Sequence, residues 1–208
     1  MALKPGKNTL AAAAAAALML ALAGCGEKDR AASSGDLPEV APSRATNTGT
    51  YPPGEPVKAK FNEFENATAN TYHQPDIPKG ASDETLVQSE GGGTTVSLKL
   101  EGLVPDREFG AHVHVNTCGA DPDQAGPHYQ DKKDPETPSV DPAYANPKNE
   151  VWLDFTTDQD GNAQAESTVD WQFREGEGRS IVIHATHTMT EKGKAGTAGE
   201  RMACINIR

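Results

Sequence analysis

Phe109-Gly110-Ala111-His112-Val113-His114 is the stretch of sequence that decides the fold. It is short, contains β-branched Val113 and follows a turn at Pro105-Asp106, so it predicts a β-strand. In a strand, residues two positions apart point to the same face, and the residue between them points to the other. His112 and His114 would therefore face the same way while Val113 packs into a core. Two imidazoles on one rigid strand can form half of a metal site.

Two further histidines stand in segments that the fold could bring to this strand. His128 follows Gly126-Pro127, and His184 ends the apolar run Ile181-Val182-Ile183. Four neutral imidazoles without a nearby thiolate or carboxylate pair suit Cu(II), which favours nitrogen ligands in a tetragonal arrangement. Each histidine alone has a simpler interpretation, as an exposed strand residue or a turn residue. Because three separate segments carry such histidines, we favour a metal site.

The first 24 residues are typical of a secretory signal. Lys4 and Lys7 precede an apolar run from Leu10 to Ala23 that is too short to predict a membrane span. The run ends at Leu22-Ala23-Gly24-Cys25, the pattern of a bacterial lipoprotein signal; an ordinary secretory signal is the alternative. We expect lipid on Cys25 to anchor the exported protein at the extracytoplasmic face of the cell membrane, since each buried methylene contributes about 0.8 kcal/mol.

The composition changes after this signal. Residues 25–56 are rich in Ser, Ala, Pro, Thr and Gly, which predicts a flexible linker before a folded domain at residues 57–208. Lys4 and Lys7 are the only charged side chains of the signal, so its removal takes the formal charge from −11 to −13. An acidic exported chain with 5% aromatic residues is not expected to bind nucleic acid. The oligomeric state does not follow from the sequence.

Cys118 and Cys204 remain once Cys25 is assigned to lipid. Two cysteines in an oxidising compartment most often form a disulfide. The bridge would close a loop of 86 residues, which in the chain-entropy treatment contributes roughly 4–5 kcal/mol to stability. Two unpaired thiols or thiolate metal ligands are the alternatives, and the short distance along the chain from Cys118 to the histidines keeps the second one open.

The rest of the domain carries strand and turn signals. Thr94–Leu103 alternates between apolar and polar residues, and Asp160-Gly161 predicts a hairpin turn. The other strands are expected at 67–73, 84–88, 109–114, 151–155, 164–173, 180–184 and 202–207. Two long loops, 116–148 and 185–200, interrupt them, and a long loop in a small domain is usually functional. Eight short strands without a helical period predict an all-β fold, an antiparallel sandwich or barrel.

Four blocks of the chain together resemble the copper–zinc superoxide dismutase family and occur in the family's order. They are GAHVHV (110–115), AGPHYQ (125–130), RSIVIHA (179–185) and AGERMACINI (198–207). The resemblance spans about residues 66–208 and implies an eight-stranded Greek-key barrel. By position, it implies four copper ligands, His112, His114, His128 and His184, a disulfide between Cys118 and Cys204, and an active-site arginine, Arg201.

The resemblance also implies an activity, the copper-dependent dismutation of extracellular superoxide to dioxygen and hydrogen peroxide. His128 would carry a proton, and Arg201 would attract and orient the anion because a guanidinium keeps its charge. A copper-binding or copper-buffering surface protein is the alternative, and a barrel with a purely structural role is a third. Retention of Arg201 favours the enzyme over the buffer, and retention of all four copper ligands argues against the structural role.

The chain departs from the family at the zinc site. Residues 129–183 contain no histidine, so two of the family's zinc ligands are missing. Glu150 and Asp154 lie near the place of the family's zinc-binding aspartate, but neither fits its motif, and a structural zinc requires four ligands. We therefore expect a copper-only protein in which the second ring nitrogen of His128 is free to make a hydrogen bond. His187 is expected to be exposed.

Overall fold

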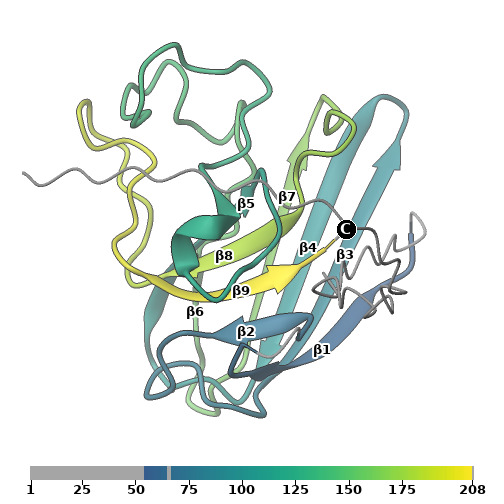
Figure 1. Cartoon of the computed structure of the whole chain (residues 1–208), viewed down its shortest axis with the longest axis vertical. Helices are drawn as coiled ribbons and strands as arrows, with labels where there is room; N and C mark the ends of the chain where they lie inside the picture. The colour runs from purple at the N-terminus through teal and green to yellow at the C-terminus, as the bar shows by residue number, and fades with distance from the viewer. Residues whose placement is uncertain (1–53, 65–66, 208) are drawn as a thin grey trace, which may run out of the picture. The chain divides into compact units, whose positions relative to one another are not determined.

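Nine strands form one sheet that curves into a nearly closed barrel in the computed structural model, which describes residues 54–64 and 67–207 (Figure 1). The strands are β1 (Val57–Asn62), β2 (Ala69–Thr71), β3 (Ser82–Glu90), β4 (Gly93–Glu101), β5 (Glu108–His114), β6 (Phe155–Thr156), β7 (Ala163–Val169), β8 (Ser180–His184) and β9 (Arg201–Asn206). Their order in the sheet is β6-β5-β8-β9-β2-β1-β3-β4-β7. The predicted all-β barrel is confirmed.

The strand count differs from the prediction by one. The additional strand is β1, whose Val57 and Phe61 are buried and whose Lys58 and Lys60 are exposed, the alternation of a strand with one face on a core. The sheet is mixed because β1 pairs with β2 in parallel, whereas the other ladders are antiparallel. The expected strand at 151–155 shrinks to β6 and a single bridge at Trp152.

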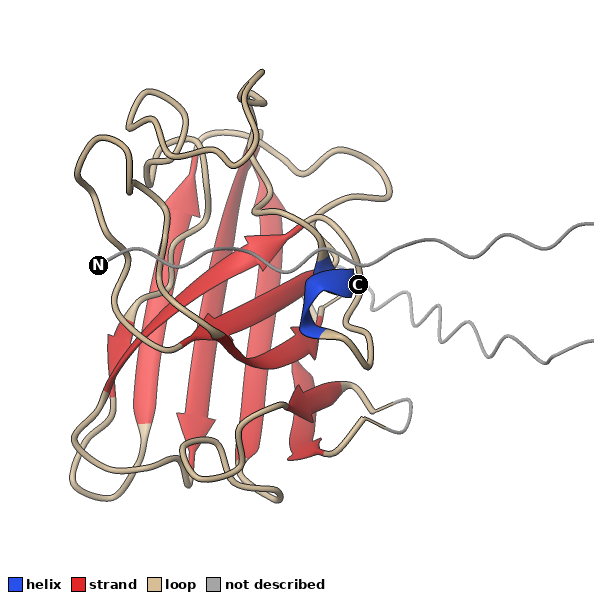
Figure 2. Cartoon of the chain, turned by 60° about the vertical axis from the view of Figure 1, so that its left-hand side comes forward, coloured by secondary structure: helices blue, strands red, loops and turns tan. Residues whose placement is uncertain are grey.

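The core lies between the two sides of the barrel. Val96, Leu98 and Leu100 of β4 point inward, as their alternation predicts, and meet Ile181 and Ile183 of β8 in one cluster. Figure 2 shows the β5–β8–β9 side crossing in front of the longer strands, with the long loops beyond the strand ends. Residues of β4 and β8 therefore stabilise the barrel by removing apolar surface from water.

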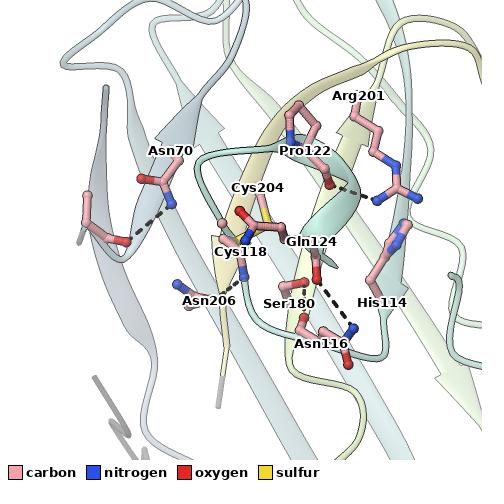
Figure 3. The surroundings of a disulfide bond; sticks show 12 residues. Asn70, His114, Asn116, Cys118, Pro122, Gln124, Ser180, Arg201, Cys204 and Asn206 are labelled. Carbon is pink, nitrogen blue, oxygen red and sulfur yellow. Dashed lines mark hydrogen bonds between the residues drawn. A yellow bond between two sulfur atoms is a disulfide. The ribbon is translucent and has the colours of Figure 1, made fainter. Parts of the chain in front are cut away.

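Every residue of β8 is buried, which a strand with one solvated face would not show. The outer side chain Val182 packs in a second, smaller cluster with Cys118, Ala125 and Cys204, and Tyr72 packs against it. Cys118 and Cys204 form the predicted disulfide, so the alternatives of free thiols and thiolate ligands are excluded (Figure 3). The disulfide joins the first long loop to β9, and this loop covers the outer face of β8.

The histidine strand β5 is likewise covered on both faces. Phe109, Ala111 and Val113 belong to the main core, so the intervening Gly110 and the two histidines face outward beneath the loops. A Cβ atom on Gly110 would lie 2.6 Å from the Thr186 carbonyl oxygen, because the loop at residues 185–200 crosses directly over this position. The absence of a side chain at Gly110 thus allows the second loop to approach the site.

Asp83 is a buried carboxyl group inside the barrel, away from the histidines. Its Oδ1 accepts a hydrogen bond from Thr85 Oγ1 at 2.7 Å, its Oδ2 has no partner, and burial raises its pKa to about 7. The folded protein therefore binds a proton that the unfolded chain has lost above its ordinary pKa of 3.8. Stability should fall as the pH rises between these two values.

We expect Asp83→Asn to remove this pH dependence. Wild-type stability should fall relative to that of the variant by on the order of 2 kcal/mol between pH 5 and pH 7, because one pKa unit corresponds to about 1.4 kcal/mol. Urea unfolding of both metal-free proteins at the two pH values measures the difference. Parallel pH profiles would show that the buried carboxyl group does not titrate in this range.

Residues 1–24, Cys25 and most of the 25–56 linker lie outside the described residues, so the expected signal, lipidation site and linker stay predictions. Within residues 54–64 and 67–207, no helix has the length and apolar character needed to cross a bilayer.

Candidate metal centre

Four imidazoles meet at one end of the barrel. His112 and His114 come from β5, and the pairing of Gly110 with His184 places the end of β8 beside them. His128 reaches the group from the first long loop, where it forms an isolated bridge with His114. One ring nitrogen from each residue lies within 4.8 Å of the others, and this is the one such group of three or more potential ligands in the part of the chain that the structure describes.

The partner atoms determine which nitrogen of each ring carries the proton. Three of the rings place Nδ1 against an oxygen that can only accept a hydrogen bond, so Nδ1 is the protonated atom and Nε2 keeps its lone pair. The three contacts are His114 Nδ1 to Gly126 O at 2.8 Å, His128 Nδ1 to Glu150 Oε2 at 2.9 Å, and His184 Nδ1 to Gly199 O at 3.3 Å.

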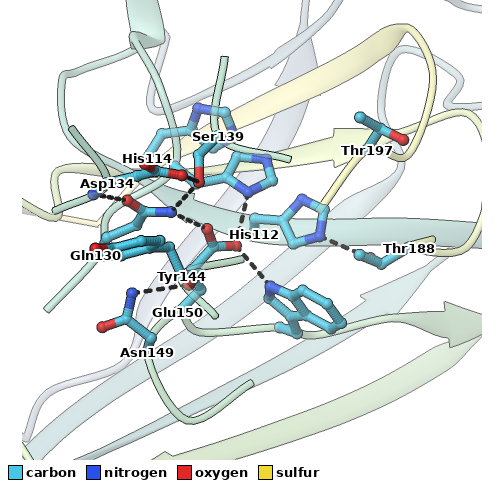
Figure 4. Close-up of polar contacts among 12 residues, drawn as sticks. His112, His114, Gln130, Asp134, Ser139, Tyr144, Asn149, Glu150, Thr188 and Thr197 are labelled. Carbon is cyan, nitrogen blue, oxygen red and sulfur yellow. Dashed lines mark hydrogen bonds and ion pairs between the residues drawn. The ribbon is translucent and has the colours of Figure 1, made fainter. Parts of the chain in front are cut away.

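In the His112 ring the two nitrogens have exchanged roles, because Nε2 makes the hydrogen bond. Its Nε2 lies 2.7 Å from Thr188 Oγ1 (Figure 4). That hydroxyl donates to Asp154 Oδ1 at 2.6 Å, so it must accept the imidazole proton. The Thr188 backbone N–H also donates to Asp154 Oδ2 at 2.7 Å. The remaining nitrogen, His112 Nδ1, is buried and has no hydrogen-bond partner. A buried lone pair without a partner is destabilising unless a cation or donor meets it.

The cluster is suited to a metal cation. Burial, followed by repulsion from His128, lowers the pKa of His112 and His114 well below the ordinary value, and burial lowers the pKa of His184 to about 3. These rings are therefore neutral at physiological pH. The Nε2 atoms of His114 and His184 are 3.4 Å apart, although each carries a lone pair. A positive ion between them would relieve this repulsion, and four nitrogen donors match Cu(II).

The Glu150 carboxylate lies next to Nδ1 of His128, the ring nitrogen that is not a candidate metal ligand. Its side chain is almost fully buried and accepts three hydrogen bonds, from His128 Nδ1 at 2.9 Å, Trp152 Nε1 at 2.7 Å and Gln130 Nε2 at 2.7 Å (Figure 4). The sequence alone assigns no role to Glu150 and predicts a free hydrogen-bonding nitrogen on His128. The structure supplies Glu150 as the acceptor and thereby fixes the orientation of the His128 ring.

Arg201 lies beside the cluster, as predicted. Its Nη1 donates to Pro122 O at 2.8 Å (Figure 3). Its Nη2 donates to Gly126 O at 2.8 Å, and its Nε is 3.6 Å from Asp123 Oδ1. Gly126 O also accepts the proton of His114 Nδ1, so one carbonyl oxygen links the arginine to a candidate ligand. The guanidinium is thus held next to the histidine cluster.

The 3-10 helix Pro122–Ala125 presents these carbonyl groups to Arg201. Asp121 caps it by accepting a hydrogen bond from Asp123 N, and the Gln124 side chain accepts one from Asp121 N. The sequence predicts a long loop at residues 116–148, so this short helix is an addition to the prediction. The cap explains how a polar segment without apolar periodicity holds an ordered turn next to the site.

A cleft of about 870 Å³ opens onto this site and is lined by His128, His184, Glu150 and Arg201. Its rim is acidic, because it carries three carboxylates and one lysine; the carboxylates are those of Asp134, Glu136 and Glu177. That lysine, Lys133, is already paired with Glu177 Oε1 at 2.9 Å. Attraction of an anion into the cleft would therefore depend on Arg201.

His187 does not join the cluster. Its Nε2 lies 3.0 Å from the backbone oxygen of Phe155, and the side chain is half-buried, which corrects the expectation that it is exposed. The reason is that residues 185–188 fold back across β6. The neighbouring Thr188 is the residue that reaches His112, and no local sequence signal distinguishes it from the other threonines of this loop.

The barrel and site define a class of protein, a β-barrel in which four imidazoles that could hold a metal ion converge beside a fixed guanidinium. Residues 83–207 match the family described as copper/zinc superoxide dismutase. The chain belongs to the copper/zinc superoxide dismutase family.

A solved structure of the Brucella abortus enzyme shows the same fold. The Cu/Zn superoxide dismutase from Brucella abortus superposes with a TM-score of 0.51 at 19% sequence identity, over 74% of this chain and 100% of that chain. A double mutant of a superoxide dismutase-like protein from Bacillus subtilis gives a TM-score of 0.45 at 17% identity, over 58% of this chain and 85% of that one.

Proposed function

We propose that this protein is a copper-dependent superoxide dismutase that works without zinc. The observation that carries the proposal is the convergence of four imidazole lone pairs, each fixed by a hydrogen bond on the opposite nitrogen, beside Arg201. Export and a lipid anchor at Cys25 belong to the proposal, and superoxide outside the cytoplasm is then the substrate. Release of a Cys25→Ser variant from membranes into the soluble fraction would support the anchor, and its retention there would contradict it.

Copper would be held by His112 Nδ1 and by the Nε2 atoms of His114, His128 and His184. Bound copper would supply the redox chemistry, alternating between Cu(II) and Cu(I) as one superoxide is oxidised to dioxygen and the next is reduced to hydrogen peroxide. The protein contributes the geometry around it. Thr188 and Asp154 fix the ring of His112, and Gly126 O fixes that of His114.

Arg201 and His128 carry the remaining roles. The permanent charge of Arg201 binds and orients the anion at the base of the cleft. Its two terminal nitrogens donate to backbone carbonyl oxygens, which do not neutralise the charge, and the exposed Asp123 carboxylate lies 3.6 Å from its Nε. His128 is the ligand placed to carry a proton, since its ring lines the cleft and Glu150 holds its Nδ1. Because Nδ1 is held by Glu150, Nε2 of His128 would hold either copper or the proton, and not both at once.

Glu150 is the feature that favours a copper-only site. In a site that also held zinc, the second nitrogen of His128 would have to give up its proton to bind that metal. Here this nitrogen is engaged by a carboxylate that accepts two other hydrogen bonds, from Trp152 and Gln130. The acceptor fixes the ring and its tautomer without a second cation.

Metal reconstitution tests the function directly. Metal-free protein is loaded with copper alone, zinc alone or both, and the bound metals and the rate of superoxide removal are measured. We expect one copper per chain, no stoichiometric zinc, and full activity with copper alone. One zinc per chain would refute the copper-only site, and bound copper without activity would indicate a copper buffer instead of an enzyme.

A further inference from the structure

One arginine holds three consecutive residues that follow the candidate ligand His128. Arg174 lies in the connection between β7 and β8, far from His128 in the sequence. Its backbone N–H donates to Tyr129 Oη at 3.0 Å, its Nη2 to Gln130 O at 2.8 Å and its Nη1 to Asp131 O at 2.9 Å. Its guanidinium also lies over the Tyr129 ring, 4.4 Å from the centroid.

The Arg174 side chain is itself held in place. Glu177 Oε2 accepts from its Nε at 3.1 Å and its Nη2 at 2.8 Å, and this ion pair raises the pKa of Arg174 against the opposing effect of burial. Nearby, Phe173 packs edge-on against Tyr129 with 4.8 Å between ring centroids. Gly178 has a φ of +65°, and a Cβ atom there would lie 2.5 Å from the Phe173 ring. The connection is therefore a tight turn that aims Arg174 at the loop.

Gln130 transmits this contact to the metal centre. While Arg174 holds its backbone oxygen, its side-chain Nε2 donates to Glu150 Oε1 at 2.7 Å and to Ser139 Oγ at 2.9 Å. Its Oε1 accepts from Asp134 N at 2.9 Å. Gln130 is buried, so the loss of these partners would leave polar atoms away from water. The amide thus joins the two arms of the first long loop to the carboxylate that orients His128.

We propose that Arg174 is a positioning residue that orders residues 129–150, and with them His128 and Glu150, before any metal binds. This inference deepens the proposed function and rests on it in one respect: a protein that uses no zinc needs another means of ordering this loop. A planar fork with several donors suits the task, because it can satisfy two carbonyl oxygens and one carboxylate at once.

Hydrogen exchange of the metal-free full-length protein tests the ordering. The variants are Arg174→Ala, Arg174→Lys and, as a control, Lys133→Ala, whose ammonium contacts the same Glu177 but none of the loop carbonyl oxygens. For Arg174→Ala we expect exchange of the amides of residues 130–134 and 149–150 to rise about tenfold, while those of β4 and β8 keep their protection. Lys133→Ala should exchange like the wild type.

The copper-loaded proteins supply a second readout. We expect Arg174→Ala to change the electron paramagnetic resonance spectrum of bound Cu(II), because His128 loses its fixed orientation, and Lys133→Ala to leave that spectrum unchanged. Wild-type exchange rates in the loop of Arg174→Ala would overturn the proposal, whatever the activity of the enzyme. If the alanine variant does not fold, Arg174→Lys decides: it keeps the charge but not the fork, so wild-type protection in its loop would equally refute the inference.

Discussion

Replacement of Glu150 by alanine is expected to weaken copper binding by about 100-fold, the upper part of the range for groups that orient a metal ligand. The carboxylate accepts from His128, Gln130 and Trp152, and its removal leaves three donors without a partner in a buried place. His128 Nδ1 no longer needs to carry the proton, so the tautomer with Nε2 protonated becomes accessible. In that tautomer the nitrogen that faces the other imidazoles cannot bind a metal.

Glu150→Gln is the matched variant. Glutamine keeps the size of the side chain but offers one acceptor oxygen and one amide group that only donates, so it cannot satisfy all three donors. Its copper affinity should lie between those of the alanine variant and the wild type. Competition with a chelator of known affinity measures the three dissociation constants, and quenching of Trp152, 6.0 Å from the His112 ring, reports the binding. Equal affinity in all three proteins would show that Glu150 does not orient the ligand.

The sequence was most informative where function depends on local periodicity. His112, Val113 and His114 alternate on a strand, and this alone places two imidazoles outside the core and a valine in it. His184 ends an apolar strand whose antiparallel pairing with β5 brings it to Gly110. Family blocks add His128 and Arg201, and the structure places them beside the other three histidines, while the roles of these residues stay predictions.

The groups that orient these residues could not be found in the same way. Glu150, Thr188 and Arg174 reach the site through contacts that span 22, 76 and 44 residues. None of them belongs to a periodic segment, and each is chemically similar to many exposed residues of an acidic, polar chain. Their roles follow from how the two long loops pack over β5 and β8, which depends on tertiary contacts and not on local preference.

The burial of the outer face of β8 is another feature that the sequence predicts only in part. An apolar strand of five residues is compatible with a sheet covered on both faces, but the sequence does not say what covers it. The cover is the disulfide-linked segment that contains Cys118 and Ala125. The same segment supplies Pro122 O and Gly126 O to Arg201, so the disulfide stabilises the position of the arginine as well as the fold.

Replacement of Arg201 by alanine is expected to lower the rate of superoxide removal by about 100-fold, the size of effect seen when one preorganised electrostatic group is lost from a site. Copper binding should change little, because Gly126 O keeps its hydrogen bond from His114 Nδ1 and the four ligand nitrogens are untouched. Pulse-radiolysis rates and metal content measure the two effects separately. Loss of copper together with activity would mean that Arg201 holds the site together instead of acting on the substrate.

Arg201→Lys separates charge from geometry. An ammonium keeps the positive charge but cannot donate to Pro122 O and Gly126 O in the same fork. The lysine is therefore expected to be held less firmly and to recover part of the rate.

The difference in the rate of superoxide removal between the wild type and the alanine variant should narrow as salt is added, because the screening length falls from about 10 Å at 0.1 M to about 3 Å at 1 M. Among the described residues that line the cleft, the one other cation, Lys133, is paired with Glu177. If this difference in rate does not depend on salt, Arg201 acts by direct contact with the anion at the metal and not by attracting it over a distance.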